Sequence, residues 1–232
     1  MARRKVAPRE EAPSGFSQIL ERLLHLEPAA VAAIVVDALG ESVDYAGELS
    51  SFDTKIAGVH FRVVWDEISH SALAGALVQI VVRARDRTFV MRRLPDGYAL
   101  VVVLARRAFS SSPRALAVVE RELSLEAGWP VPTSRPWYPV EVQSAAPPPE
   151  RSHARRRLQK PRPARLRESL PGAGWEPLEV LGSVMGLRRE RGYRCRLKSG
   201  AELTLIREPT GRWYADEHVG RPPERLTPLF RG

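Results

Sequence analysis

The hydrophobic and polar positions of residues 16–129 follow helical spacing in some stretches and alternate in others. Apolar residues from Phe16 to Leu24 recur at i, i+3, i+4, i+7 and i+8, which predicts a short amphipathic helix. Another helix is expected after Ser112-Pro113 and should end at Gly128. Between the two helices, runs rich in β-branched and aromatic residues predict strands over 31–37, 41–49, 76–83, 88–93 and 98–104.

A longer helix is predicted over residues 54–73, with Asp53 and Thr54 available as its N-cap. Its apolar residues cover two sides: the first set is Ile56, Val59 and Val63, and the second is Ala57, Phe61, Val64 and Ile68. A helix that is apolar on two sides is usually buried on two sides. We therefore expect one side to meet the sheet of its own chain and the other to meet a second copy, and the periodicity does not say which is which.

The pattern changes after residue 129, which predicts a domain boundary there. Residues 130–172 are rich in Pro and Arg and have no period, so we expect a disordered basic linker. Alternation returns in residues 173–220, with turn signals at Ser199-Gly200 and Pro209-Thr210-Gly211, and predicts a small antiparallel β-meander. Residues 1–15 and 221–232 are expected to be a disordered arm and a tail.

Composition narrows the class of protein. The single cysteine among 232 residues excludes a disulfide within the chain and a four-cysteine zinc site. The N-terminus lacks the apolar region of a secretory signal. The longest apolar run, YALVVVLA at 98–105, is far shorter than the roughly 20 residues of a membrane span. We expect a cytoplasmic protein without membrane insertion.

The formal net charge of +9 is unevenly distributed. Residues 16–129 carry 12 Lys and Arg against 14 Asp and Glu, whereas residues 130–171 carry 9 against 3. A basic run in 151–167 either spaces the chain by self-repulsion or binds an acidic protein or nucleic acid in a salt-dependent manner. Both readings remain open at this point.

The order helix, strand, strand, long helix, three strands and helix resembles the Roadblock family, which is related to dynein light chains. The resemblance rests on AAIVVDALG at 32–40, the two-sided helix 54–73, YALVVVLA, and the closing helix that ends in LEAG. It implies an α+β fold of the α/β/α type, with five strands in one antiparallel sheet and the long helix on one face. It also implies dimerisation through that helix and strand 76–83. The family often has Asp-x-Asp-Gly in the first turn, and Leu39 before Gly40 departs from that pattern.

The resemblance further implies a partner. Bacterial members bind small Ras-like GTPases in polarity or motility systems; some stimulate GTP hydrolysis and others act as adaptors. In this chain, Asp37-x-x-Gly40 could belong to a nucleotide site, but no Gly-x-x-x-x-Gly-Lys-Ser/Thr loop accompanies it. We therefore expect Asp37 to accept N–H groups of a turn, and the chain to hold a GTPase rather than to be one.

No catalytic residue, cofactor or metal site is predicted. The five histidines form no His-Glu-x-x-His pair, and Ser183 lies one place early for a Gly-x-Ser-x-Gly elbow. Cys195 alternates with arginines that should point to the opposite strand face, so we expect a buried structural thiol.

These observations predict a non-catalytic homodimeric regulator or adaptor of a small Ras-like GTPase in a bacterial polarity, motility or signalling system. The candidate partner contacts are Lys55, His60, Arg62, Trp65 and Glu67. The candidate dimer contacts are Phe61, Val64, Ile68 and Ala72. The alternative is a basic-tailed nucleic-acid-binding or scaffold protein in which the Roadblock-like part only dimerises.

Overall fold

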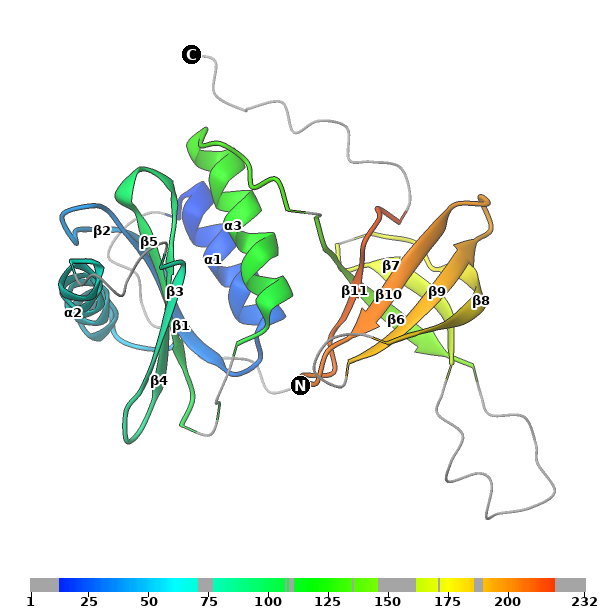
Figure 1. The fold of residues 1–232 in the computed structure, drawn as a ribbon, viewed down its shortest axis with the longest axis horizontal. Coiled ribbons are helices and arrows are strands. Elements are labelled where there is room, and N and C mark those ends of the chain that lie inside the picture. Colours follow the sequence, from blue (N-terminus) through cyan, green and yellow to red (C-terminus); the bar gives the residue numbers. More distant parts are fainter. Residues whose placement is uncertain are drawn as a thin grey trace. The chain divides into compact units, whose positions relative to one another are not determined.

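The computed structural model of the chain describes residues 13–70, 77–106, 108, 111–134, 136–145, 162–170, 172–185 and 190–219. The chain divides into two compact units, residues 1–134 and 135–232. Both units are drawn in Figure 1. Each has its own sheet and its own core.

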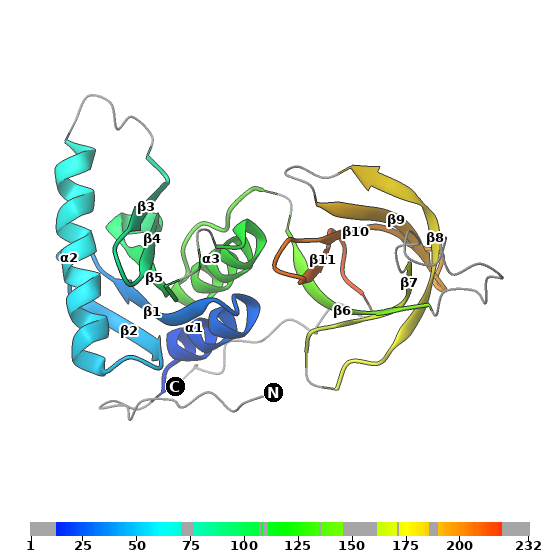
Figure 2. The same ribbon diagram turned by 90° about the horizontal axis from the view of Figure 1, so that it is seen from below.

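The first unit contains three helices and one antiparallel sheet in the order β2-β1-β5-β4-β3. Figure 2 shows α2 along one face of this sheet and α1 and α3 along the other. Its elements are α1 (Gly15–Leu26), β1 (Ala30–Val36), β2 (Ser42–Gly47), α2 (Ser51–Ser69), β3 (Gln79–Arg83), β4 (Thr88–Arg93), the short helix η1 (Pro95–Gly97), β5 (Ala99–Leu104) and α3 (Pro113–Ala127). Helices and strands therefore follow the predicted order.

The central strands β1 and β5 are apolar on both faces because helices cover both faces. They pair antiparallel, with Ile34 opposite Val101, and β5 is buried along its whole length. At the edge of the layer formed by α1 and α3, the Glu27 carboxylate accepts the N–H of Ser112 at 2.6 Å. This buried hydrogen bond links the end of α1 to the start of α3.

The second unit is a closed six-stranded barrel in the order β10-β11-β6-β7-β8-β9. All neighbouring strands are antiparallel. Its interior includes the fully buried side chains of Leu166, Cys195, Leu205 and Ala215. The strands are β6 (Tyr138–Ser144), β7 (Pro163–Glu168), β8 (Glu176–Met185), β9 (Arg191–Leu197), β10 (Glu202–Arg207) and β11 (Trp213–Ala215).

The barrel corrects two predictions. Strands β6 and β7 lie inside the segment predicted to be a disordered linker, and the predicted meander is the remainder of a closed barrel. Val140 and Leu166 point into the barrel core, but the surrounding Pro and Arg residues conceal their alternation in the sequence. Part of the basic run, including Arg165 and Arg167, belongs to β7. Residues 146–161, 1–12 and 220–232 lie outside the described residues.

Among the described residues, no helix combines the length and the apolar character that a membrane crossing requires.

Candidate protein-binding face on helix α2

Helix α2 is held at its N-terminus by local hydrogen bonds. The Ser50 hydroxyl accepts the N–H of Asp53 at 3.0 Å, and the Thr54 hydroxyl donates to the Ser50 carbonyl at 2.9 Å. Asp53 also places a negative charge in the first turn, where it complements the helix dipole. These contacts start the helix three residues earlier than the sequence predicted.

A glycine lets α2 lie close to the sheet. A Cβ on Gly58 would stand 2.6 Å from Val36 Cγ1 and 3.0 Å from Ile34 Cδ1. The same side of the helix buries Trp65, which packs in one cluster with residues of β1, β4 and β5. This side is therefore the one that meets the sheet.

The opposite side of α2 carries an apolar stripe that is open to solvent. Phe52 is 70% exposed, Ile56 40%, Val59 43% and Val63 52%. Spacings of four, three and four residues align these side chains along one face of the helix. We call these four residues the α2 stripe. Phe52 was not among the predicted contacts, although it is an apolar residue four positions before Ile56 in the sequence.

The α2 stripe contains Ile56, Val59 and Val63, which form the apolar set without the predicted dimer contacts. Phe61 stacks on Phe89 with ring centroids 4.5 Å apart, and Val64 is half-buried. Ile68 is 38% exposed at the end of the helix. Ala72 lies outside the described residues.

The predicted partner contacts divide into three groups: a buried residue, residues that are at least partly open to solvent, and Arg62. Trp65 is only 5% exposed, so its predicted contact with a partner is wrong: the side chain fills the core. Half-buried Lys55 places Nζ 5.5 Å from the ring centroid of Tyr45. His60 and Glu67 are exposed.

Arg62 forms the third group, because its guanidinium is engaged within the unit. It forms a two-point ion pair with Asp66, with N–O distances of 3.0 and 2.9 Å, and donates to the Gly97 carbonyl. These bonds tie α2 to the turn between β4 and β5. The Arg62 guanidinium is therefore held by contacts within the first unit.

Strand β3 lies at one edge of the sheet, and β2 lies at the other. Among the described strands, β3 pairs only with β4, so no described strand neighbours its other edge. Val78 and Val81, at 55% and 43%, are exposed along this segment. An apolar helix stripe and an open strand edge thus belong to the same unit.

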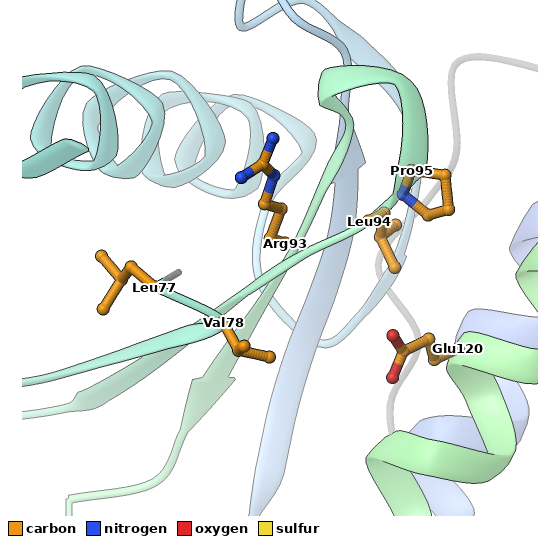
Figure 3. A pocket seen from close by; sticks show the side chains of 6 residues that line it. All are labelled: Leu77, Val78, Arg93, Leu94, Pro95 and Glu120. Atoms are coloured by element: carbon orange, nitrogen blue, oxygen red, sulfur yellow. The ribbon is translucent and has the colours of Figure 1, made fainter. Parts of the chain in front are cut away.

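A small cavity of about 300 Å³ adjoins β3 on the side of α3. It is lined by Leu77, Val78, Arg93, Leu94, Pro95 and Glu120. Figure 3 shows Leu94 pointing toward Glu120 and Arg93 pointing the other way. Glu120 is engaged by Arg92 at 2.6 Å. The volume is at the lower limit for small-molecule sites, and we assign no ligand to it.

The polar groups singled out in the sequence have structural roles. Asp37 Oδ1 accepts the N–H groups of Leu39 and Glu41 at 2.9 and 2.8 Å, which confirms the predicted turn. Burial raises the pKa of the Cys195 thiol to about 12, as expected for an inert buried cysteine. Within the described part of the chain, no group of three or more His, Cys, Asp or Glu side chains could hold a metal ion.

Several solved structures are similar to about half of this chain. No family model and no curated protein matches the chain. Similar solved structures include Myxococcus xanthus MglB (17% identity, 50% of this chain and 96% of that one, TM-score 0.41). A Roadblock/LC7 domain from Streptomyces avermitilis has 15% identity and a TM-score of 0.37, over 48% of this chain and 91% of that one. The gliding protein MglB from Thermus thermophilus has 14% identity and a TM-score of 0.43, over 55% of this chain and 98% of that one.

All three similar structures have TM-scores below 0.5 against this chain. The matches cover about half of the chain, and identities below one fifth transfer no residue role, partner or activity from these proteins. The proposed function of the first unit therefore rests on its own surface.

Proposed function

We propose that the chain is a non-catalytic homodimeric regulator or adaptor that binds a small Ras-like GTPase in a bacterial polarity, motility or signalling system. The α2 stripe is the observation that carries the proposal. An amphipathic helix on a monomer normally turns a polar face to water, whereas α2 turns four apolar side chains outward. Such a stripe favours a protein partner.

A second copy suits the stripe because a two-fold axis places the same patch on both sides of an interface. Each side chain of this size contributes about 1.5–3 kcal/mol when fully buried. The stripe alone offers less than the roughly 800 Å² per partner of a standard interface. The open edge of β3 extends the surface, so the proposed dimer uses both elements.

The proposed dimer acts by binding. Arg62 is held by Asp66 and Gly97, and Asp37 serves the β1–β2 turn. Neither group is therefore available to the phosphates of a nucleotide. Any effect on GTP hydrolysis would come from positioning the switch residues of the GTPase itself.

The dimer is tested with Val63→Asp, which places a charge in the middle of the α2 stripe. Light scattering coupled to size exclusion should give the dimer mass for the wild type and the monomer mass for the variant. Leu125→Asp is the matched control, because Leu125 is 60% exposed on α3, on the other face of the sheet. A dimer that survives Val63→Asp, in a folded variant, would refute this interface.

GTPase binding is tested separately. The purified chain serves as bait in lysate of its source organism, once with GDP and once with a non-hydrolysable GTP analogue, and mass spectrometry identifies what is retained. We expect a small Ras-like GTPase enriched in one nucleotide state and bound again as a purified protein. Absence of such a GTPase in both states would count against the proposal.

Charge distribution favours a second candidate, nucleic-acid or acidic-scaffold binding by the second unit. Residues 135–232 carry 20 Lys and Arg against 11 Asp and Glu, whereas residues 1–134 carry 16 of each. On the barrel, Arg167 pairs with Glu141 and Arg194 with Glu202, so part of this charge is already neutralised. Removing residues 135–232 should abolish salt-sensitive nucleic-acid binding under this alternative and spare GTPase binding under the first.

A further inference from the structure

The tip of the turn between β1 and β2 carries an exposed apolar side chain. Leu39 is 83% exposed, a larger fraction than for any other exposed large apolar residue in the described part of the chain. Polar residues and glycine usually occupy tight turns because they tolerate water and special backbone angles. The Leu39 side chain therefore contributes little to the core and is accessible to a partner.

The turn that presents Leu39 is fixed by its own hydrogen bonds. In addition to the two N–H groups accepted by the Asp37 carboxylate, the Asp37 N–H donates to the Glu41 carbonyl at 3.0 Å. Gly40 adopts a φ of 86°, which favours glycine, and donates its N–H to the Asp37 carbonyl at 3.2 Å. The leucine backbone is therefore restrained before any partner arrives.

The same turn is packed onto its surroundings. Gly40 is buried, and a Cβ on it would lie 3.4 Å from Arg62 Cγ and 4.0 Å from Val59 Cα. A Cβ on Gly97 would lie 3.1 Å from Ala38 Cβ, so the β4–β5 turn touches the β1–β2 turn. Leu39 thus projects from a rigid corner beside the α2 stripe.

The charges around this corner are mainly acidic. Asp37, Glu41 and Asp96 lie in the two turns. Asp66 accepts from Arg62, which also donates to the Gly97 carbonyl in the β4–β5 turn. Arg62 is the cation that the described contacts place there, and Asp66 pairs with it. A second copy docked here about a two-fold axis would bring acidic groups against acidic groups, which is unfavourable. The corner therefore fits a different protein, one with basic residues around an apolar depression.

We propose that Leu39 is the apolar anchor through which the GTPase docks, entering a depression on the GTPase that is rimmed by Lys or Arg. This inference rests on the proposed function and adds to it the contact that sets specificity. An exposed side chain on a restrained backbone loses mainly its own rotamer freedom on binding, and burial of its apolar surface favours the complex. The acidic rim accelerates association with a basic partner and makes it sensitive to salt.

The test measures the affinity of the purified GTPase, loaded with GDP or a non-hydrolysable GTP analogue, for the full chain by titration calorimetry. Leu39→Ala should weaken binding about tenfold or more, while circular dichroism and the dimer mass stay unchanged. Leu125→Ala, the matched control, should leave the affinity unchanged. Glu41→Lys should slow association and flatten its dependence on salt concentration.

The outcomes separate this inference from the function on which it rests. Unchanged affinity of Leu39→Ala, for a GTPase that the wild-type chain binds, overturns the role of Leu39 and leaves the proposed function standing. A changed dimer mass in Leu39→Ala would identify a second copy as the occupant and also overturn it. If the wild-type chain binds no Ras-like GTPase in either nucleotide state, the proposed function itself fails, and this inference fails with it.

Discussion

Replacing Gly58 by alanine is expected to destabilise the chain, although the same change in an exposed helix interior normally stabilises it by about 1 kcal/mol. The reason is the close approach of α2 to β1. The added methyl group would lie 2.6 Å from Val36 Cγ1 and 3.0 Å from Ile34 Cδ1. Ile34 can turn its terminal methyl aside, but fully buried Val36 has a short branched side chain with nowhere to move.

The magnitude follows from two opposing terms. Overpacking a tight core costs typically about 1–3 kcal/mol, and the gain in helix propensity offsets about 1 kcal/mol of it. The expected net loss is therefore up to about 2 kcal/mol. If α2 instead moves outward to accommodate the methyl group, the α2 stripe moves with it and the dimer weakens.

Urea unfolding followed by far-ultraviolet circular dichroism measures the effect. Protein concentration must be the same for all variants, because dimerisation couples stability to concentration. His60→Ala is the control, since it raises helix propensity at an exposed position of the same helix and should stabilise by a few tenths of a kcal/mol. A Gly58→Ala variant as stable as the wild type, or more stable, would refute the close packing of α2 on β1.

Two further predictions concern titratable groups. Cys195 should resist thiol reagents in the folded chain at pH 8 and react readily in urea, because burial raises its pKa to about 12; rapid labelling of the native protein would contradict a closed barrel core. Burial raises the pKa of Glu122 above its usual value, and Arg22, 2.6 Å away, only partly opposes this. The folded chain therefore holds this proton more tightly than the unfolded chain, and the associated stability, full below pH 4.5, is lost as pH rises through the folded pKa. Urea unfolding at pH 4 and pH 7 should show Glu122→Gln improving relative to the wild type as pH rises, and an equal difference at both pH values would contradict the burial.

Residues with local signals were predictable from the sequence. Strand β4 and helix α3 have the predicted boundaries. For α3 the reason is local: Ser112 caps its start, Pro113 is its first residue, and Gly128 caps its end. Asp37 was predicted correctly for the same reason: its partners are two and four residues away. Local chemistry was sufficient wherever the interacting groups are close in sequence.

The orientation of α2 was not predictable from periodicity alone, because both sides of the helix are apolar. Gly58 carried the missing information, since a glycine in a helix interior often marks close packing. With Gly58 on the sheet side, Trp65 two turns later is also on that side, and Val59 and Val63 face outward. The exposed position of Leu39 follows from the turn and was visible only as a departure from the family pattern.

The barrel was missed because its decisive pairing is distant. Strand β6 contains Pro139, which lowers its apparent strand propensity, and it pairs with the three residues of β11 near the other end of the unit. No local pattern reports that contact. The Pro- and Arg-rich stretch therefore looked like a linker, although its two ends are strands β6 and β7 of the barrel.

The pairing of β6 with β11 also determines when the second unit can be completed during synthesis. The first strand of the barrel needs its last strand as a neighbour, so the ring cannot close until the ribosome has released residues 213–215. The first unit contains all of its own sheet partners by residue 104 and its last helix by residue 127. Domains generally fold as units, N-terminal first, so the first unit can fold, and become available to a partner, while the barrel is still an open set of strands.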